Sequence, residues 1–117
     1  MTWKYFSLAE MSCSHCGECR MSEEFMEKIE WARANCDFPW IVRSGYRCLL
    51  YDKEIGGEGN HPMGEAIDVA FSNSHQLFII IRESIQQGIR RIGISFKNKF
   101  VHLDIVKGRP DEIIWGY

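Results

Sequence analysis

Residues 61–68 read His-Pro-Met-Gly-Glu-Ala-Ile-Asp, and residues 100–104 read Phe-Val-His-Leu-Asp. Both stretches combine histidine and aspartate with small, apolar or turn-forming residues. The first predicts a turn at Pro62 and Gly64 that leads into a strand, and the second predicts another strand. Two imidazoles and two carboxylates are the donors that a mononuclear zinc site with one open coordination position requires. The sequence therefore predicts a metal site where these two strands meet.

The alternation of side chains along a strand sharpens this prediction. Successive residues point to opposite faces, so His102 and Asp104 share one face while Leu103 points to the other. Asp68 joins them if its strand is the neighbour, and His61 reaches the same place from the preceding turn. A single histidine in a strand is more often a hydrogen-bonded, half-buried residue than a ligand. The prediction therefore depends on all four residues occurring together.

Two helices are predicted on either side of residues 61–68. Ser22 is a good N-cap for the first, and Ser72 or Ser74 caps the second, which ends at Gly88. Apolar residues recur at helical spacing in both segments. The predicted buried stripes are Phe25, Ile29, Ala32 and Cys36 in the first helix and Leu77, Phe78, Ile81 and Ile85 in the second.

The remaining segments predict strands and connections. Strand composition is found at residues 40–43, 66–70, 91–95 and 99–106, and the last two form an antiparallel hairpin. Residues 49–60 contain Gly56, Gly57 and Gly59 and are predicted to form a ligand-adapted loop, whereas residues 1–20 form an irregular, cysteine-bearing arm. We expect an α+β fold: a small antiparallel sheet with helices packed on one side and this arm at the N-terminus.

Composition limits the classes of function. The 117 residues predict one domain, residues 1–117. With 14 basic and 16 acidic residues the chain has no excess charge for capturing a polyanion, so we expect no nucleic-acid partner. The longest apolar run, Leu77 to Ile81, is too short to span a membrane, and the N-terminus lacks the apolar core of a secretion signal. We expect a monomer that is made in the cytoplasm and has no membrane partner.

Five cysteines are present, and three of them, Cys13, Cys16 and Cys19, form a C-x2-C-x2-C pattern. An odd number of cysteines cannot all pair within one chain. The pattern is compatible with a structural zinc site at Cys13, Cys16 and Cys19 that takes a fourth ligand from Cys36 or Cys48. One or two disulfides, or reduced thiols, are the alternatives.

The motifs resemble a known family. His61-x-x-Gly64-x-Ala66-x-Asp68, together with the preceding Ser44-Gly45-Tyr46-Arg47 and the later residues 100–104, resembles the zinc D-alanyl-D-alanine carboxypeptidases and peptidoglycan endopeptidases. This family shares its fold with lysostaphin-type peptidases and the hedgehog signalling domain. The order and spacing of all three motifs match, and the cysteine-bearing arm is typical of small, phage-type members.

The resemblance implies roles for individual residues. His61, Asp68 and His102 are the implied ligands of one catalytic zinc ion, and Arg47 faces the substrate or the oxyanion as a catalytic and substrate-binding residue. A planar guanidinium suits a carboxylate or a developing oxyanion better than lysine does. The further implied substrate contacts are Ser44, Tyr46 and Trp115.

The general base is the point at which the chain departs from the family pattern. Many members carry an acid three residues before the last ligand, where this chain has Lys99. Asp104 is the predicted substitute, because it shares a face with His102; the alternative is that it only orients His102.

The resemblance implies zinc-dependent hydrolysis of an amide bond in peptidoglycan stem peptides, by a D,D-carboxypeptidase or an endopeptidase. A non-catalytic, zinc-containing cell-wall-binding module is the alternative. A chain without a secretion signal is expected to reach the cell wall after release, as a phage-encoded or virion-associated enzyme does.

Overall fold

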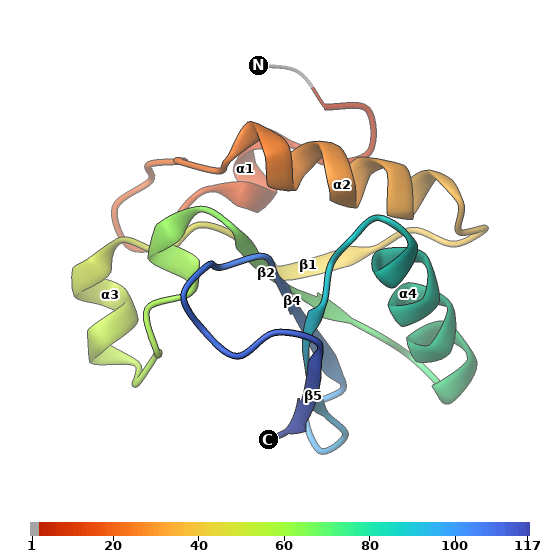
Figure 1. Cartoon of the computed structure of the whole chain (residues 1–117). Coiled ribbons are helices and arrows are strands. Elements are labelled where there is room, and N and C mark those ends of the chain that lie inside the picture. The colour runs from red at the N-terminus through yellow and green to blue at the C-terminus, as the bar shows by residue number, and fades with distance from the viewer. Residues whose placement is uncertain (1–2) are drawn as a thin grey trace.

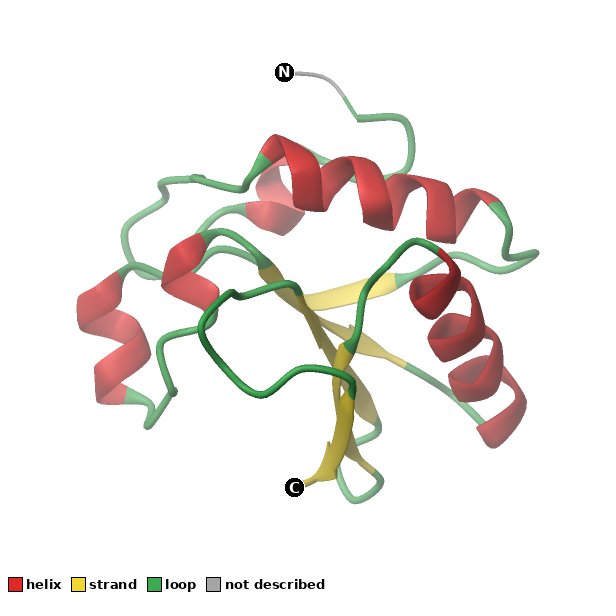
Figure 2. Ribbon diagram, viewed as in Figure 1, coloured by secondary structure: helices red, strands yellow, loops and turns green. Residues whose placement is uncertain are grey.

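The computed structural model describes residues 3–117, and they form an α+β fold, as predicted. Figure 2 shows the helices and strands by type. In chain order the elements are α1 (Leu8–Met11), α2 (Glu23–Ala34), β1 (Ile41–Ser44), α3 (Leu49–Glu54), the 3-10 helix η1 (His61–Met63), β2 (Ala66–Ala70), α4 (Ser74–Gln86), β3 (Arg91–Ser95), β4 (Phe100–Asp104) and β5 (Ile113–Gly116).

The strands form one sheet in the order β1-β2-β4-β3-β5. The predicted hairpin is present, because β3 and β4 pair antiparallel, and β2 lies antiparallel on the other side of β4. The edge strand β5 pairs parallel to β3, which the sequence did not predict. Residues 105–112 connect β4 to β5 through the wide blue loop in Figure 1. The sheet is thus mostly antiparallel, with β4 at its centre.

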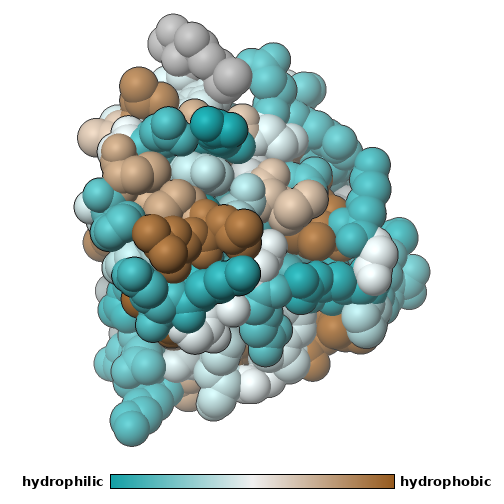
Figure 3. Space-filling model, turned by 90° about the vertical axis from the view of Figure 1, so that its left-hand side faces the viewer, coloured by the Kyte–Doolittle hydropathy of each residue, from teal (hydrophilic) through white to brown (hydrophobic). Residues whose placement is uncertain are grey.

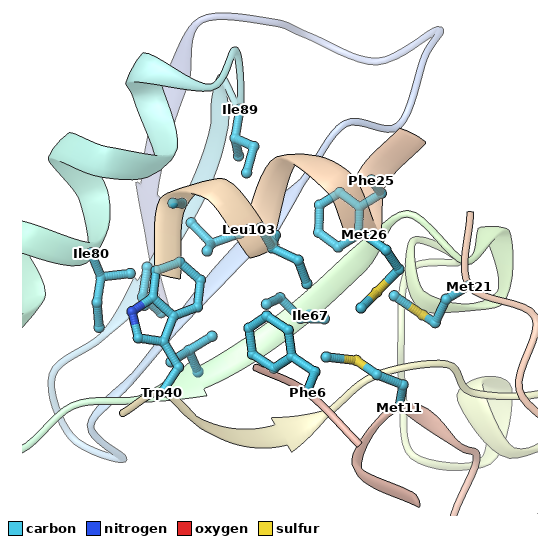
Figure 4. Close-up of a cluster of buried hydrophobic side chains, with 14 of the residues drawn as sticks. Phe6, Met11, Met21, Phe25, Met26, Trp40, Ile67, Ile80, Ile89 and Leu103 are labelled. Carbon is cyan, nitrogen blue, oxygen red and sulfur yellow. The ribbon is translucent and has the colours of Figure 1, made fainter. Parts of the chain in front are cut away.

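The hydrophobic core lies on the face of the sheet that α2 and α4 cover (Figure 1). Ile67 and Leu103 are directly opposite each other on β2 and β4, and both are fully buried in one cluster with Phe25 and Met26 of α2 (Figure 4). Burying one such side chain contributes roughly 1.5–3 kcal/mol. This burial determines which way β2 and β4 face, so that Asp68 and His102 point to the opposite side.

Helix α2 agrees with the sequence prediction, whereas α4 differs in two respects. The Ser22 hydroxyl accepts a hydrogen bond from the Phe25 amide at 3.2 Å, and all four predicted stripe residues are buried. The N-cap of α4 is Asn73 rather than Ser72 or Ser74, and its Oδ1 accepts from the Gln76 amide at 2.9 Å. Asn73 is itself a favoured N-cap residue. Gly88 follows the helix with a φ of 85°, as predicted for a C′ residue.

The buried stripe of α4 is also rotated from its predicted position. Leu77 and Ile80 are buried, whereas Phe78 is 63% exposed and Ile85 is 49% exposed. The run Leu77 to Ile81 is apolar all round, so helical periodicity alone permits more than one buried face. Contact with α2 and the sheet selects the face that carries Ile80.

The predicted loop at residues 49–60 is wrong in its first half, which forms α3. The apolar residues Leu49, Leu50 and Ile55 are exposed, while Asp52 is buried. Figure 3 views the molecule from the side on which α3 lies in Figure 1, and hydrophobic areas are visible there among hydrophilic ones. Because the polar residue faces inward, α3 lacks the amphipathic pattern by which a helix is recognised.

Candidate metal centre

Strands β2 and β4 bring Asp68 and His102 together. The two residues are register partners on the face opposite the core. His61 comes from η1, which Gly64 ends with a φ of 71°. A Cβ at Gly64 would lie 2.0 Å from the carbonyl oxygen of Arg20, so only glycine fits there. One donor atom each from His61, Asp68 and His102 lies within 4.8 Å of the other two. The structure thus brings together the three residues that were predicted as ligands.

Hydrogen bonds on the outer side of each imidazole orient the two rings. His61 Nδ1 lies 2.8 Å from the carbonyl oxygen of Gly45, and His61 Nε2 lies 3.5 Å from Asp68 Oδ1. His102 Nε2 lies 2.6 Å from Asp104 Oδ2, and His102 Nδ1 lies 3.0 Å from Asp68 Oδ1. Each ring therefore has one nitrogen on an outer acceptor and the other directed at Asp68.

This arrangement fits a divalent metal ion. A carbonyl oxygen only accepts, so His61 Nδ1 carries the hydrogen and Nε2 turns a lone pair toward Asp68. When His102 Nε2 donates to Asp104, the lone pair of Nδ1 points to the same place. Three lone pairs that converge at short range repel one another unless a cation lies among them. Two imidazoles and one carboxylate, with outer hydrogen bonds to both rings, form a typical zinc donor set.

The electrostatics of the site also favour a cation. When the two rings carry protons facing Asp68 in place of a metal ion, burial raises the pKa of Asp68, but hydrogen bonds from His102 and His61 lower it more, so the net pKa lies well below its usual range. Burial lowers the pKa of His102, but Asp104 and Asp68 raise it more, so the net shift is upward. Both directions agree with a site in which positive charge, on a proton or a metal ion, is favoured between these side chains.

A cleft of about 290 Å³ opens over the three ligands. It is lined by Arg47, Gly56, Gly57, Glu58, Asn60, His61, Asp68, Phe100, His102 and Tyr117. The predicted Arg47 is among these residues. The sequence analysis missed Glu58, Asn60 and Tyr117, because none of them belongs to a recognisable sequence motif. Glu58 and Asn60 come to the cleft from the glycine-rich turn, and Tyr117 directly follows β5.

A family model described as peptidase M15 matches residues 4–104, a segment that includes all three candidate ligands. The chain belongs to the peptidase M15 family. Comparison with curated proteins gives no match. The predicted family is confirmed at this level, and membership makes the chain a metallopeptidase by family. Within residues 3–117 of this M15 chain, no helix has the length and apolar character to cross a bilayer.

Asp104 of the M15 chain lies behind His102 rather than in the cleft. It is fully buried, and its Oδ1 accepts hydrogen bonds from Arg91 Nε at 2.7 Å and from the Val106 amide at 3.0 Å. Its Oδ2 is the partner of His102. Both oxygens are therefore engaged away from the cleft, and the geometry favours the predicted alternative, in which Asp104 orients His102.

Arg91 is a residue that the sequence analysis missed. It starts β3 and is the register partner of Asp104 across the hairpin. The Arg91 side chain is 7% exposed, and the central carbon of its guanidinium lies 5.2 Å from the Trp115 ring centroid. The hairpin register, which places Arg91 opposite Asp104, was the signal that could have identified this ion pair.

Trp115 lies beside His102 but is not among the described residues that line the cleft, so its implied substrate contact stays a prediction. Its ring centroid is 5.5 Å from that of His102. Gly93 on β3 is the register partner of both residues, and a Cβ there would lie 2.6 Å from the Trp115 ring. Because Gly93 has no side chain, the Trp115 ring can pack directly against β3.

Arg47 is held at the cleft by Asp52. Arg47 Nε lies 3.1 Å from Asp52 Oδ1, in a pair whose side chains are 16% and 1% exposed. Asp52 Oδ2 also accepts a hydrogen bond from the Gly59 amide at 2.9 Å. Asp52, which the sequence analysis missed, thus joins the arginine to the glycine-rich turn that lines the cleft.

The other predicted residues lie elsewhere. Tyr46 is buried in the hydrophobic core and is not among the described residues that line the cleft, so its substrate contact stays a prediction. Ser44 is half-buried on β1 opposite Asp68 and is absent from the lining of the cleft among the described residues. Lys99 is exposed in the hairpin turn with a φ of 54°.

The predicted cysteine cluster has a different membership in the structure. Cys13 and Cys16 come together with Cys48 rather than with Cys19. Cys48 is distant in sequence, and the fold brings it to the N-terminal arm.

Proposed function

We propose that this M15 peptidase uses one zinc ion to hydrolyse an amide bond in the stem peptides of peptidoglycan. The observation that carries the proposal is the convergence of two imidazole nitrogens and one carboxylate oxygen below a cleft that also contains an arginine. A buried donor set of this kind beside an open space is typical of catalytic rather than structural zinc.

The ligands in this proposal are His61 Nε2, Asp68 Oδ1 and His102 Nδ1. Zinc bound there would supply a Lewis acid and lower the pKa of a coordinated water from 15.7 to roughly 7. Gly45 and Asp104 hold the two rings in the tautomers that binding requires.

Arg47 is proposed to bind the carboxylate end of a stem peptide or the oxyanion that develops at the scissile carbonyl. Its Nε faces Asp52, which leaves the terminal nitrogens for the cleft. Asn60 lines the same cleft, and its Oδ1 is buried without a hydrogen-bond partner. A backbone N–H group of a bound peptide would satisfy this oxygen.

Glu58 is proposed as the proton acceptor. It is a carboxylate that lines the cleft and is not one of the three metal donors. Asp104 is fully buried and is proposed to position His102 instead. The Glu58 carbonyl oxygen accepts from Arg109 at 2.7 Å, which holds the backbone of the turn while the side chain stays exposed.

The test is incubation of the zinc-loaded chain with defined muropeptides, followed by mass analysis of the products. We expect one amide bond to be cut, and the product identifies a D,D-carboxypeptidase or an endopeptidase. His61→Ala, Asp68→Ala and His102→Ala should each abolish activity and reduce zinc binding. His75→Ala is the matched control, because His75 is exposed at the start of α4.

Two outcomes would contradict the proposal. Full hydrolysis by a zinc-free His102→Ala chain would rule out the metal site as the catalyst. Muropeptides that bind with measurable affinity but remain intact would identify a non-catalytic cell-wall-binding module.

A further inference from the structure

A second group of metal-binding side chains lies outside the cleft. One sulfur each from Cys13, Cys16 and Cys48 lies within 4.8 Å of the other two, and all three are free thiols. Cys13 and Cys16 belong to the arm between α1 and α2, and Cys48 is the residue that precedes α3. The proposed peptidase activity uses none of them.

The arm around Cys13 forms a tight turn with its amides directed inward. The Gly17 amide donates to the Cys13 carbonyl oxygen at 2.9 Å, and the Cys13 amide donates to the Glu18 carbonyl oxygen at 2.7 Å. Gly17 has a φ of 79°, which favours glycine. The Cys48 amide donates to Cys13 Sγ at 3.4 Å. Amides that point at a sulfur stabilise the thiolate, the form of cysteine that binds metal.

The protonation of the thiols is consistent with this geometry. Burial raises the pKa of Cys13, but the amides of Cys48, Cys16 and His15 lower it more, to about 6. The Glu18 amide lowers the pKa of Cys16, but burial and the neighbouring Cys13 and Cys48 thiols outweigh it and raise the pKa.

His15 offers a fourth donor. Its Nδ1 lies 3.6 Å from Cys48 Sγ. His15 is outside the group of donor atoms that all lie within 4.8 Å of one another, so binding at the thiols requires its ring to shift toward Cys13 and Cys16. Zinc–sulfur and zinc–nitrogen bonds of about 2.3 and 2.0 Å at a tetrahedral angle place S and N about 3.5 Å apart. The ring stacks on Tyr51, with centroids 5.5 Å apart and planes 3° apart, so it is oriented by α3.

We propose that Cys13, Cys16, Cys48 and His15 form a structural zinc site that ties the N-terminal arm to the segment before α3. Three sulfurs and an imidazole complete a closed four-ligand set, in contrast to the open set at His61. A disulfide would join only two of the three clustered sulfurs and leave the third unpaired.

The site lies one residue from the catalytic cleft. Cys48 directly follows Arg47, which lines the cleft. The same segment is packed on the arm at Gly45, because a Cβ there would lie 2.7 Å from Met11 Cα. The Tyr46 amide also donates to the Met11 carbonyl oxygen at 2.9 Å. Zinc at the thiols would therefore hold the backbone that carries Arg47 and orients His61.

Cobalt substitution of the full chain under reducing conditions tests this site. Thiolate-to-cobalt charge-transfer absorption arises only where sulfur binds the metal, so the nitrogen and oxygen donors at His61 do not contribute to it. We expect the band in the wild-type chain and in Cys19→Ser, and its loss in Cys13→Ser and Cys16→Ser. Cys19 is the matched control, because it lies in the same arm but outside the cluster.

Zinc stoichiometry separates the two metal sites. The double variant His61→Ala/His102→Ala should retain about one zinc ion per chain, and adding Cys16→Ser should remove it. Cys16 is exposed, so serine there leaves the hydrophobic core intact, and circular dichroism checks folding. His15→Ala should weaken zinc binding at the thiols without changing zinc binding at His61.

Three results would overturn the proposal: no charge-transfer band in a reduced chain with excess cobalt, an equal band in Cys16→Ser, or a native disulfide among the three cysteines, seen as a mass loss of two hydrogens. These results leave the peptidase test unaffected, because that test reads muropeptide cleavage. An inactive wild-type chain that still shows the band would contradict only the proposed function.

Discussion

Asp104 Oδ2 lies 2.6 Å from His102 Nε2, and both side chains are buried. The carboxylate is anchored on its other oxygen by Arg91 and the Val106 amide. His102 is therefore held from behind, with Nδ1 presented to Asp68. This pair gives an aspartate two residues after a candidate metal ligand a positioning role even without access to the cleft.

We predict that Asp104→Asn weakens metal binding rather than proton transfer alone. Asparagine keeps the shape but loses the charge that favours Nε2–H on His102. Metal affinity should fall by about 10- to 100-fold, and excess zinc should restore most of the turnover. Isothermal titration with zinc and turnover at two zinc concentrations measure this. Asp111→Asn, at an exposed carboxylate paired with Arg90, is the control. Unchanged metal affinity with turnover that zinc does not restore would instead identify Asp104 as the base.

Glu58→Gln should lower turnover without lowering metal affinity, the reverse of what we expect for Asp104→Asn. The amide cannot accept a proton, so turnover should fall by roughly 100-fold or more, within the usual range for a general base. Metal content should not change, because Glu58 is not one of the three donors. Metal analysis and steady-state kinetics are the measurements, and Glu54→Gln on α3 is the control. Near-normal turnover would eliminate Glu58.

Arg47→Lys is expected to lower kcat/KM although it keeps the charge. Lysine is a point charge and cannot face both Asp52 and the cleft. A lost charge-assisted hydrogen bond costs about 1.5–3 kcal/mol, which corresponds to roughly 10- to 100-fold. The thermal midpoint should also fall, since Asp52 is buried and loses part of its pairing. The exposed Arg43→Lys on β1 should change neither value; an equal effect there would point to a general effect of lysine.

Gly93→Ala should disrupt the site through packing. The new Cβ would meet the Trp115 ring at 2.6 Å, whereas a Cβ at Gly116, also in the sheet, has its nearest contact at 4.0 Å. Overpacking of this kind costs about 1–3 kcal/mol. Denaturant unfolding should show that loss for Gly93→Ala and a much smaller change for Gly116→Ala. Activity should fall as well, since Trp115 lies against His102. Equal stability of the two variants would mean that β5 moves without cost.

Glu65→Gln should stabilise the chain at neutral pH. Burial raises the pKa of Glu65, and the nearby Glu24 and Asp104 carboxylates raise it further against the opposing effect of Lys107. A folded-state pKa above the unfolded one makes the glutamate favourable at low pH and less so as pH rises through the folded pKa. The thermal midpoint of Glu65→Gln should therefore exceed that of the wild type at pH 7, with a gain that shrinks as the pH falls through the raised folded-state pKa and is absent below about pH 4. The exposed Glu27→Gln is the control, and a gain that grows on acidification would contradict the sign.

Local rules were enough to predict the strands that carry the candidate ligands Asp68 and His102. Side chains alternate along any strand, so the placement of His102 and Asp104 on one face followed from their spacing of two. The N-cap at Ser22 is equally local, because the capping bond spans three residues. The His61 turn was identified from Pro62 and Gly64 for the same reason.

The sequence by itself thus determined strands β1 to β4, helix α2 and the three candidate ligands, because period, capping and turn chemistry act over a few residues; it did not predict α1 or β5. Only the tertiary structure decided that Asp104 is buried outside the cleft and that Asp52 faces inward from α3. It also decided that Cys48, rather than Cys19, lies next to Cys13 and Cys16. Whether a residue is buried depends on which other parts of the chain pack against it. Contacts between residues far apart in sequence, such as Cys13 and Cys48, exist only once the sheet and the arm have packed together.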